Sequence, residues 1–407
     1  MKLVDLTEFY SQRGGGVRSH LSAKGHVSCQ LGHQHWVIAP GPEITKEIAV
    51  PPANAGGGSS ILHVGGPALP YDPTYHLLWR LGRVRKLVGR IRPDVLEIHS
   101  PYLAAIGAMA VPAAHFGIRT FVWHADFIDT YLRGGLERSV MGLPGRPKAT
   151  TAARAVDAAV EPLWAWVRTI AASCCATFAA SRFQADKLRE HGVARVELVP
   201  FGVEKAIFRP DQRDESLRRE RLGERHGPLV VAIGRFAVEK RWDVIMEAFD
   251  RIALAKPGAK LLVFGDGPER ARIETWAKAR GDVELVGFLR GRAPLARLLA
   301  SSDLLLHACP FETFGLGVAE AIASGLPAVV PDRGGAAELA RGESVVTYPS
   351  LDAAAAAASA LALLERPSNA LRSAAADTAA KVHSMEDHFK ALFERYEALL
   401  TAAKTAI

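Results

Sequence analysis

Two glutamates separated by a glycine-rich turn are the residues of this chain best suited to chemistry. Glu312 precedes the run Phe314-Gly315-Leu316-Gly317, and Glu320 follows that run inside an alanine-rich stretch with helical character. On one continuous helix this spacing would separate the carboxylates by about 12 Å, too far for a hydrolase pair acting on a single bond. The glycines predict a later helix start, near Gly317, which leaves Glu312 on a loop and Glu320 one turn inside the helix.

A loop that leads glycines into a helix N-terminus is suited to binding an anion. The first-turn N–H groups and the positive end of the helix dipole both face whatever lies in front of them. With one carboxylate at each side, an extended ligand with an anionic middle fits this stretch. A sugar nucleotide has that shape, since a diphosphate joins a hydroxylated ring to a ribose. The alternative is an ordinary loop with two solvated glutamates.

A second group of charged residues follows an expected strand at 229–233. Gly234 and Arg235 close that strand, and Lys240 comes shortly after. Fixed cations stabilise the negative charge that grows on a departing phosphate more than they stabilise the ground state. The alternative is that both cations are only solvated.

The first half of the chain offers weaker candidates. Gly15 and Gly16 lie in the first βα turn, where glycine lets backbone approach a phosphate closely. His124 ends an expected strand, and Asp126 comes two residues later. The carboxyl ends of strands are where sites form in α/β proteins, although a single histidine there can equally be structural.

The elements that would position these residues alternate between strand and helix patterns, which predicts an α/β protein with parallel sheets. Expected strands are 3–6, 36–38, 93–98, 121–123, 176–180 and 196–199, then 229–233, 260–264, 283–286, 304–307 and 328–330. Expected helices are 17–31, 77–91, 351–364 and 385–402. Glycine-rich 54–60 and 134–151 are expected loops, and 211–227 is an expected surface segment.

Composition restricts the class of protein. The four cysteines show no metal-ligand spacing, and the adjacent Cys174 and Cys175 are expected on a buried helix of a protein in a reducing cytosol. No apolar run approaches the roughly 20 residues of a membrane span. The net charge of +7 lies wholly in residues 1–205, where 23 basic residues face 16 acidic ones. This asymmetry favours an anionic lipid surface or nucleic acid as partner, or serves solubility alone.

The motif Glu312-x7-Glu320, with FGLG between and SGLP after, resembles the signature of family 4 retaining glycosyltransferases, which have the GT-B fold. Gly234-Arg235 with Glu239-Lys240 resembles that family's phosphate-binding element. The turn at Gly265 and the segment ending at Phe288 resemble those beside the nucleotide. The resemblance implies two Rossmann-like domains facing a cleft, 1–205 on the acceptor side and 206–382 on the nucleotide-sugar side, with a helix in 383–407 crossing back to the first domain.

The resemblance also implies roles for residues of this sequence. A hexosyl unit would pass from a UDP-sugar or GDP-mannose to a hydroxyl of a glycan, lipid or lipid-linked acceptor, in synthesis of the cell envelope or of polysaccharides. The implied catalytic residues are Glu312, His124, Arg235 and Lys240. The implied donor-binding residues are Gly15, Gly16, Gly234, Gly265, Phe288, Phe314, Gly315, Leu316 and Glu320.

Metal and further cofactors are not expected, because no Asp-x-Asp and no clustered ligand spacing occurs. Nucleic acid is not expected as a partner of such an enzyme. The expected location is the cytoplasm, with peripheral contact to the inner membrane face if the basic helix 77–91 docks there. Two alternatives remain at this point. One is a sugar-nucleotide epimerase of the same fold, and the other is a non-catalytic sugar-nucleotide-binding protein.

Overall fold

A computed structural model describes residues 1–10, 16–50, 57–70, 72–133, 149–287, 289 and 291–405. The chain forms two compact units. Unit 1 comprises Met1–Pro200 and Glu386–Ile407, and unit 2 comprises Phe201–Met385. Gly15 and Phe288, both expected to bind the donor, lie outside the described residues.

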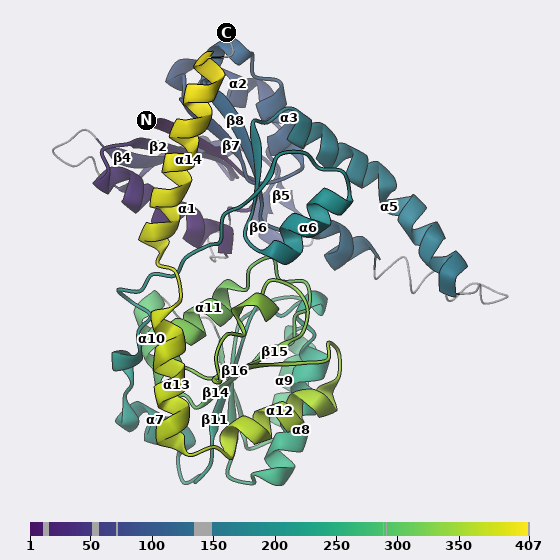
Figure 1. The fold of residues 1–407 in the computed structure, drawn as a ribbon, viewed down its shortest axis with the longest axis vertical. Coiled ribbons are helices and arrows are strands. Elements are labelled where there is room, and N and C mark those ends of the chain that lie inside the picture. Colours follow the sequence, from purple (N-terminus) through teal and green to yellow (C-terminus); the bar gives the residue numbers. More distant parts are fainter. Residues whose placement is uncertain are drawn as a thin grey trace. The chain divides into compact units, whose positions relative to one another are not determined.

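Unit 1 is built on a sheet in the order β10-β9-β8-β7-β1-β2-β4-β3, parallel except for the β3–β4 pair (Figure 1). Its strands are β1 (Lys2–Leu6), β2 (Gln34–Gly41), β3 (Lys46–Val50), β4 (Gly58–Gly65), β7 (Val95–Ile98), β8 (Ile118–Trp123), β9 (Ala176–Ala179) and β10 (Val196–Leu198). Two short strands, β5 (Ala68–Leu69) and β6 (Asp72–His76), form a separate pair. Its helices are α1 (Gly16–Gln30), α2 (Leu81–Ile91), α3 (Leu103–Met109), α5 (Ala149–Ala172), α6 (Arg182–Glu190) and α14 (Met385–Thr405).

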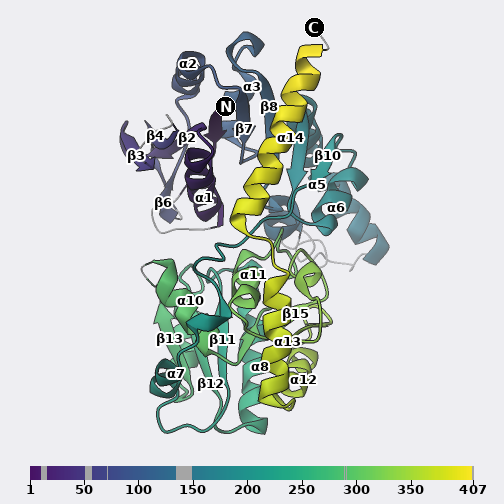
Figure 2. The same cartoon turned by 60° about the vertical axis from the view of Figure 1, so that its left-hand side comes forward.

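The C-terminal helix α14 belongs to unit 1, although the chain reaches it from unit 2. It lies beside α1 in both views of the fold (Figures 1 and 2). Phe389 of α14 packs against His20 of α1 with ring centroids 4.9 Å apart, and Tyr396 bonds Lys24. The apolar residues of α14 recur at helical spacing because they line the one face of the helix that packs on unit 1.

Unit 2 has a parallel sheet in the order β13-β12-β11-β14-β15-β16 (Figure 2). Its strands are β11 (Leu229–Ile233), β12 (Lys260–Phe264), β13 (Val283–Gly287), β14 (Leu304–Leu306), β15 (Ala328–Pro331) and β16 (Val345–Tyr348). Its helices are α7 (Glu215–Leu222), α8 (Trp242–Ala255), α9 (Arg270–Lys278), α10 (Arg292–Ser301), α11 (Leu316–Ala323), α12 (Ala353–Leu364) and α13 (Ser368–Ala380). Strands β11, β12, β14 and β15 are short, mainly apolar runs that are buried on both faces, as parallel strands covered by helices require, whereas β13 and β16 at the two edges are less buried.

Four expectations about local structure are wrong. The glycine-rich stretch 54–60 is not all loop, because β4 begins at Gly58. The helix expected from residue 77 begins only at Leu81, and helix α5 begins at Ala149, inside the expected loop 134–151. Cys174 and Cys175 lie in the turn between α5 and β9 instead of on a helix. Cys174 is nevertheless buried, and burial raises the pKa of its thiol to about 11.

Candidate functional site

The order of strands in unit 2 creates the position where an α/β sheet binds ligands. Strand β11 pairs with β12 on one side and with β14 on the other, so the chain reverses its direction across the sheet between β11 and β14. Loops that leave the carboxyl ends of two such strands diverge and leave a crevice between them. Lys240 follows β11, and Glu312 follows β14.

Lys240 and Glu312 meet at this position. The ammonium Nζ lies 2.5 Å from Oε1 of Glu312, and the side chains keep 22% and 17% of their surface exposed. Nε2 of His307, directly after β14, lies 3.5 Å from the same carboxylate oxygen. Two residues from distant parts of the sequence thus form a partly buried ion pair that keeps access to solvent.

Charges around this pair fix the protonation of its members. Burial alone would raise the pKa of Glu312, but Lys240, His307 and the hydrogen bonds of the carboxylate together outweigh burial and lower it. Burial would lower the pKa of Lys240, but the charge and hydrogen bond of Glu312, with smaller contributions from Cys309 and Glu239, outweigh burial and raise it. Burial, with the charge of Lys240, lowers the pKa of His307 to about 4. At neutral pH the site therefore holds one carboxylate, one ammonium and one neutral imidazole.

Two glycines shape the loop that carries Glu312. Gly315 has φ of 88° and ends the loop in the left-handed conformation, so that α11 begins at Leu316. The N–H of Gly335 donates to the carbonyl oxygen of Glu312 at 2.7 Å, and a Cβ on Gly335 would lie 2.5 Å from the oxygen of Thr313. The loop after β14, which carries Glu312, and the loop after β15, which carries Gly335, are therefore in backbone contact, and a side chain at position 335 would obstruct this contact.

Glu320 lies one turn inside α11 and is buried. Arg292, at the start of α10, donates to its Oε1 at 2.6 Å and also approaches Glu204 at 3.3 Å. Burial raises the pKa of Glu320, and Arg292 opposes that rise. Sequence reasoning missed Arg292, because nothing in the local pattern distinguishes it from the exposed arginines of this chain.

The remaining expected residues of unit 2 lie close to this pair. A Cβ on Gly234 would come 3.7 Å from the side-chain carbons of Lys240, and a Cβ on Gly265 would come 1.9 Å from the oxygen of Gly234. The backbone oxygen of Arg235 accepts a hydrogen bond from Nε1 of Trp242. Phe314 is buried, with its ring 5.6 Å from that of Phe201.

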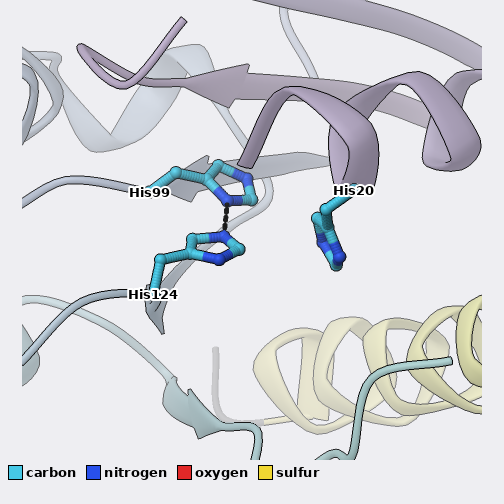
Figure 3. Close-up of side chains that lie close together, drawn as sticks. All are labelled: His20, His99 and His124. Carbon is cyan, nitrogen blue, oxygen red and sulfur yellow. Dashed lines mark hydrogen bonds between the residues drawn. The ribbon is translucent and has the colours of Figure 1, made fainter. Parts of the chain in front are cut away.

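In unit 1, His124 directly follows β8 and joins two histidines that sequence reasoning missed. His99 follows the neighbouring strand β7, and its Nδ1 lies 2.6 Å from Nε2 of His124 (Figure 3). His20 of α1 completes the group, with its ring centroid 5.1 Å from that of His124. The signal for His99 was its place directly after a strand, the same signal that singled out His124.

Two other candidates of unit 1 have different surroundings. Gly16 is the first residue of α1 and is exposed. Asp126 is buried and shares Lys187 with Asp129 in an ion pair. That pairing gives Asp126 a structural partner, which supports the structural alternative for this residue.

Type and distance would allow the three histidines to hold a metal ion. Their nearest ring nitrogens all lie within 4.8 Å of one another. Two nitrogen ligands on one tetrahedral ion, however, lie about 3.3 Å apart for bonds of about 2.05 Å. The 2.6 Å between His99 and His124 is shorter than this and fits a hydrogen bond.

Comparison with known proteins gives matches over most of the chain. A family model described as Glycosyltransferase Family 4 matches residues 14–206, and one described as Glycosyl transferases group 1 matches residues 227–366. The chain is 30% identical over 335 residues to the GDP-mannose-dependent alpha-(1-6)-phosphatidylinositol dimannoside mannosyltransferase of Mycobacterium tuberculosis, covering 81% of this chain and 79% of that protein. It is also 30% identical to a GDP-mannose-dependent alpha-mannosyltransferase of Mycolicibacterium smegmatis, covering 83% and 82%.

Solved structures match at lower identity. Sucrose-phosphate synthase from Thermosynechococcus elongatus has a TM-score of 0.73 and 17% identity, covering 98% of this chain and 99% of that one. The catalytic domain of Starch Synthase IV from Arabidopsis thaliana, bound to ADP and acarbose, has a TM-score of 0.69 and 14% identity, covering 98% and 99%. At this identity the likeness shows the fold.

Proposed function

The chain belongs to family 4 of the glycosyltransferases and has the GT-B fold, and from this membership we propose that it moves a mannosyl unit from GDP-mannose to a hydroxyl of a lipid-linked acceptor, with retention of configuration. The observation that carries the chemistry is the ion pair of Lys240 and Glu312 at the switch point of unit 2. The proposed donor and acceptor class follow those in the names of the two mycobacterial relatives.

Lys240 and Glu312 suit the two parts of such a donor, its diphosphate and its sugar. The ammonium of Lys240, with Arg235 nearby in sequence, stabilises the diphosphate as its bond to the sugar breaks. The carboxylate of Glu312 is held ionised, so it accepts hydrogen bonds from sugar hydroxyls. Glu320, oriented by Arg292, accepts from the ribose hydroxyls. His124 contacts the donor near the reacting carbon, and the leaving phosphate takes the acceptor's proton.

A screen of nucleotide sugars tests the proposed donor. The purified protein is incubated with GDP-mannose, UDP-glucose and other donors, each with a lipid extract as acceptor, and released GDP or UDP is measured. Acceptor-dependent GDP release from GDP-mannose is the expected result. Turnover of UDP-sugars alone would reject the proposed donor. Donor turnover without any acceptor would favour the epimerase alternative, which the comparisons do not support.

We further propose that the reaction does not require a metal ion. The cations at the site of unit 2 are side chains, and the histidine pair of unit 1 is spaced for a hydrogen bond. Transfer is expected to continue at an unchanged rate after dialysis against EDTA. Loss of activity that Mn²⁺ or Mg²⁺ restores would show that a metal takes part.

The proposed contact with a membrane surface is argued from helix α2. Its apolar residues Val84 and Val88 are buried, so they hold the helix to unit 1 and are not available to lipid. Its cations Arg83, Arg85, Lys86 and Arg90 are exposed. The structure pairs none of these four with a carboxylate among the residues it describes. Trp79, just before the helix, is 60% exposed. We propose that this basic face, with Trp79, contacts anionic lipid.

Sedimentation with vesicles tests this contact. Each cation near an anionic surface adds about 1 kcal/mol, and salt screens the attraction. Binding is expected at low salt, to decrease at high salt, and to be lost in Arg83→Glu/Arg90→Glu. The matched control is Arg154→Glu/Arg182→Glu, which reverses the same charge at exposed positions on α5 and α6. Equal loss of binding in both double variants would show that net charge alone, and not the basic face of α2, causes the binding. No binding at low salt would reject the contact.

No helix in the described segments is both long and apolar enough to cross a bilayer.

A further inference from the structure

Unit 1 encloses a charged group that the proposed chemistry does not use. Lys24 of α1 is fully buried, and its Nζ lies 2.7 Å from Asp5 on β1 and 2.7 Å from Glu97 on β7. The hydroxyl of Tyr396 on α14 lies 3.1 Å from the same nitrogen. Burying charged groups is costly unless they are paired, so this group must be close to neutral in total.

The remaining oxygens of the two carboxylates have donors of their own. Nε2 of His35 lies 2.6 Å from Oδ2 of Asp5. Thr120 and Tyr396 donate to Oε2 of Glu97 at 2.8 and 2.6 Å. His99 approaches the two oxygens that Lys24 contacts, because its Nε2 lies 3.3 Å from Oδ1 of Asp5 and 3.3 Å from Oε1 of Glu97.

The charges determine where the protons of His99 reside. Two carboxylates against the single ammonium of Lys24 leave one negative charge uncompensated. An imidazolium neutralises it best at His99, which lies against both carboxylates, whereas His35 contacts Asp5 alone. Nε2 of His99 lies between two carboxylate oxygens, which accept and do not donate, so we assign a proton to it. The imidazolium carries a second proton on Nδ1, which lies 2.6 Å from Nε2 of His124. Figure 3 shows these two rings joined by that bond.

The pKa directions of the neighbouring groups agree with this assignment. Burial would lower the pKa of His99, but Asp5 and Glu97 outweigh burial and raise it. Burial, followed by the charge of His99, holds the pKa of His124 well below its usual range. Burial and the surrounding histidines do the same for His20 on α1. From α14, His388 approaches His20 and Tyr396 approaches Glu97, which completes the titratable groups around this centre.

We propose that His99 is a positioning residue for sugar transfer, which donates its Nδ1–H to Nε2 of His124 and thereby fixes the remaining proton of His124 on Nδ1. This inference rests on the proposed contact of His124 with the donor. Nε2 of His124 is occupied as an acceptor, so His124 acts as a hydrogen-bond donor through Nδ1 and not as a base. The buried positive charge of His99 behind it makes that donor stronger, as an adjacent ionised group does in a hydrogen-bonded chain.

Two variants of His99 separate the donated proton from the shape of the ring. His99→Leu removes the donor, and His99→Asn retains an N–H close to the position of Nδ1. Loss of one preorganised hydrogen-bond donor at a reacting centre costs about 10²–10³ in rate. We therefore expect His99→Leu to lower kcat about 10²-fold with little change in KM for the donor, and His99→Asn to recover much of that loss. Equal losses in both variants would contradict the donated proton.

The pH profile supplies a readout that a purely structural role would not move. The raised pKa of His99 means that its imidazolium is present below that pKa and is lost as pH rises through it. Wild-type kcat should therefore fall at alkaline pH, whereas the profile of His99→Asn should lack this limb, because an amide does not titrate. The matched control is His35→Asn, which removes a buried histidine from the same Asp5 without touching His124. It should keep the alkaline limb.

A double-mutant cycle with His124→Ala tests whether His99 acts through His124. In the His124→Ala background, His99→Leu should cause no further loss of kcat. Full additivity of the two losses would overturn the proposal. If His124→Ala itself keeps wild-type kcat, the proposed role of His124 fails, and His99 has no reaction to position.

Nitrogen-15 chemical shifts of the histidine rings test the proton positions without any activity. In the wild-type protein His124 is expected to be protonated on Nδ1 and His99 on both nitrogens. A His124 ring protonated on Nε2 would overturn the proposal even if sugar transfer is confirmed. If no donor is turned over but the expected tautomers are observed, the proposed function fails while the arrangement of protons stands. Tight Zn²⁺ binding that displaces these protons would identify a metal centre in place of the hydrogen bond between His99 and His124.

Discussion

Glu312→Gln is expected to lower kcat by about 10²–10³-fold, the usual cost of removing one preorganised group at a reacting centre. The amide has nearly the same shape, but it carries no charge and has one acceptor oxygen where the carboxylate has two. If that oxygen faces Lys240, the contact loses its ionic component, and an N–H₂ group replaces the acceptor for sugar hydroxyls. Initial rates of GDP release at saturating GDP-mannose measure the effect.

Lys240→Met should cause a loss of similar size by removing the cation beside the leaving group. The matched control is Glu284→Gln on β13, since Glu284 is also a partly buried carboxylate of unit 2 with basic partners, Lys260 and Arg221, each at 2.7 Å. That control should remain active, because Lys260 begins β12 and thus lies at the amino ends of these parallel strands, whereas the switch point lies at their carboxyl ends. Near-wild-type kcat in both Glu312→Gln and Lys240→Met would refute the proposed site.

Lys24→Met is expected to destabilise unit 1 by about 3–5 kcal/mol, the range for removing one partner of a buried ion pair. The change leaves Asp5 and Glu97 buried without their shared cation. Hydrogen exchange of the amides in β1 and β7 measures the effect locally, which is preferable to a global melting curve for a chain of two units. The control is Lys390→Met, whose exposed pair with Glu386 should be worth less than about 1 kcal/mol.

The destabilisation by Lys24→Met should depend on pH with a defined sign. In the folded protein the pKa of Asp5 lies well below its usual value, because Lys24 and two histidines outweigh burial. A depressed pKa contributes stability above the unfolded pKa of about 3.9, and that stability is lost as pH falls through the folded pKa. The difference between wild type and variant should therefore be full near pH 7 and decrease in acid. A difference independent of pH would show that packing, and not charge, makes Lys24 important.

Five of the six strands of unit 2 were predictable from sequence because each is a short, mainly apolar run between polar turns, whereas β16 (Val345–Tyr348) was missed. Leu229–Ile233 and Lys260–Phe264 were predicted with the bounds that the structure gives. The missed strands of unit 1 do not show this pattern. Residues Lys46–Val50 form an exposed edge strand with two charged residues, and its partner β4 begins at a glycine. Such strands form because a neighbouring strand is available for pairing, and the local sequence pattern carries no information about that neighbour.

The chemistry of unit 2 could be predicted because Glu312, Glu320, Lys240 and their glycines lie in recognisable motifs. Their contacts could not, since the ion pair of Lys240 and Glu312 joins loops far apart in sequence. The buried group of unit 1 was missed for a similar reason. Lys24 lies in a helix, where a lysine is ordinarily exposed, and only the tertiary structure shows it between two strands and α14.

The central claim is tested most directly by following the fate of the sugar. GDP-mannose labelled with carbon-13 at C1 is incubated with the protein and a lipid-linked acceptor, and the C1 signal is recorded by NMR as the reaction proceeds. The account expects the signal of the donor's α-mannosyl phosphate to be replaced by that of an α-mannoside, with one GDP released for each mannose transferred. A β-mannoside, or a new sugar nucleotide formed without acceptor and without release of GDP, would contradict it.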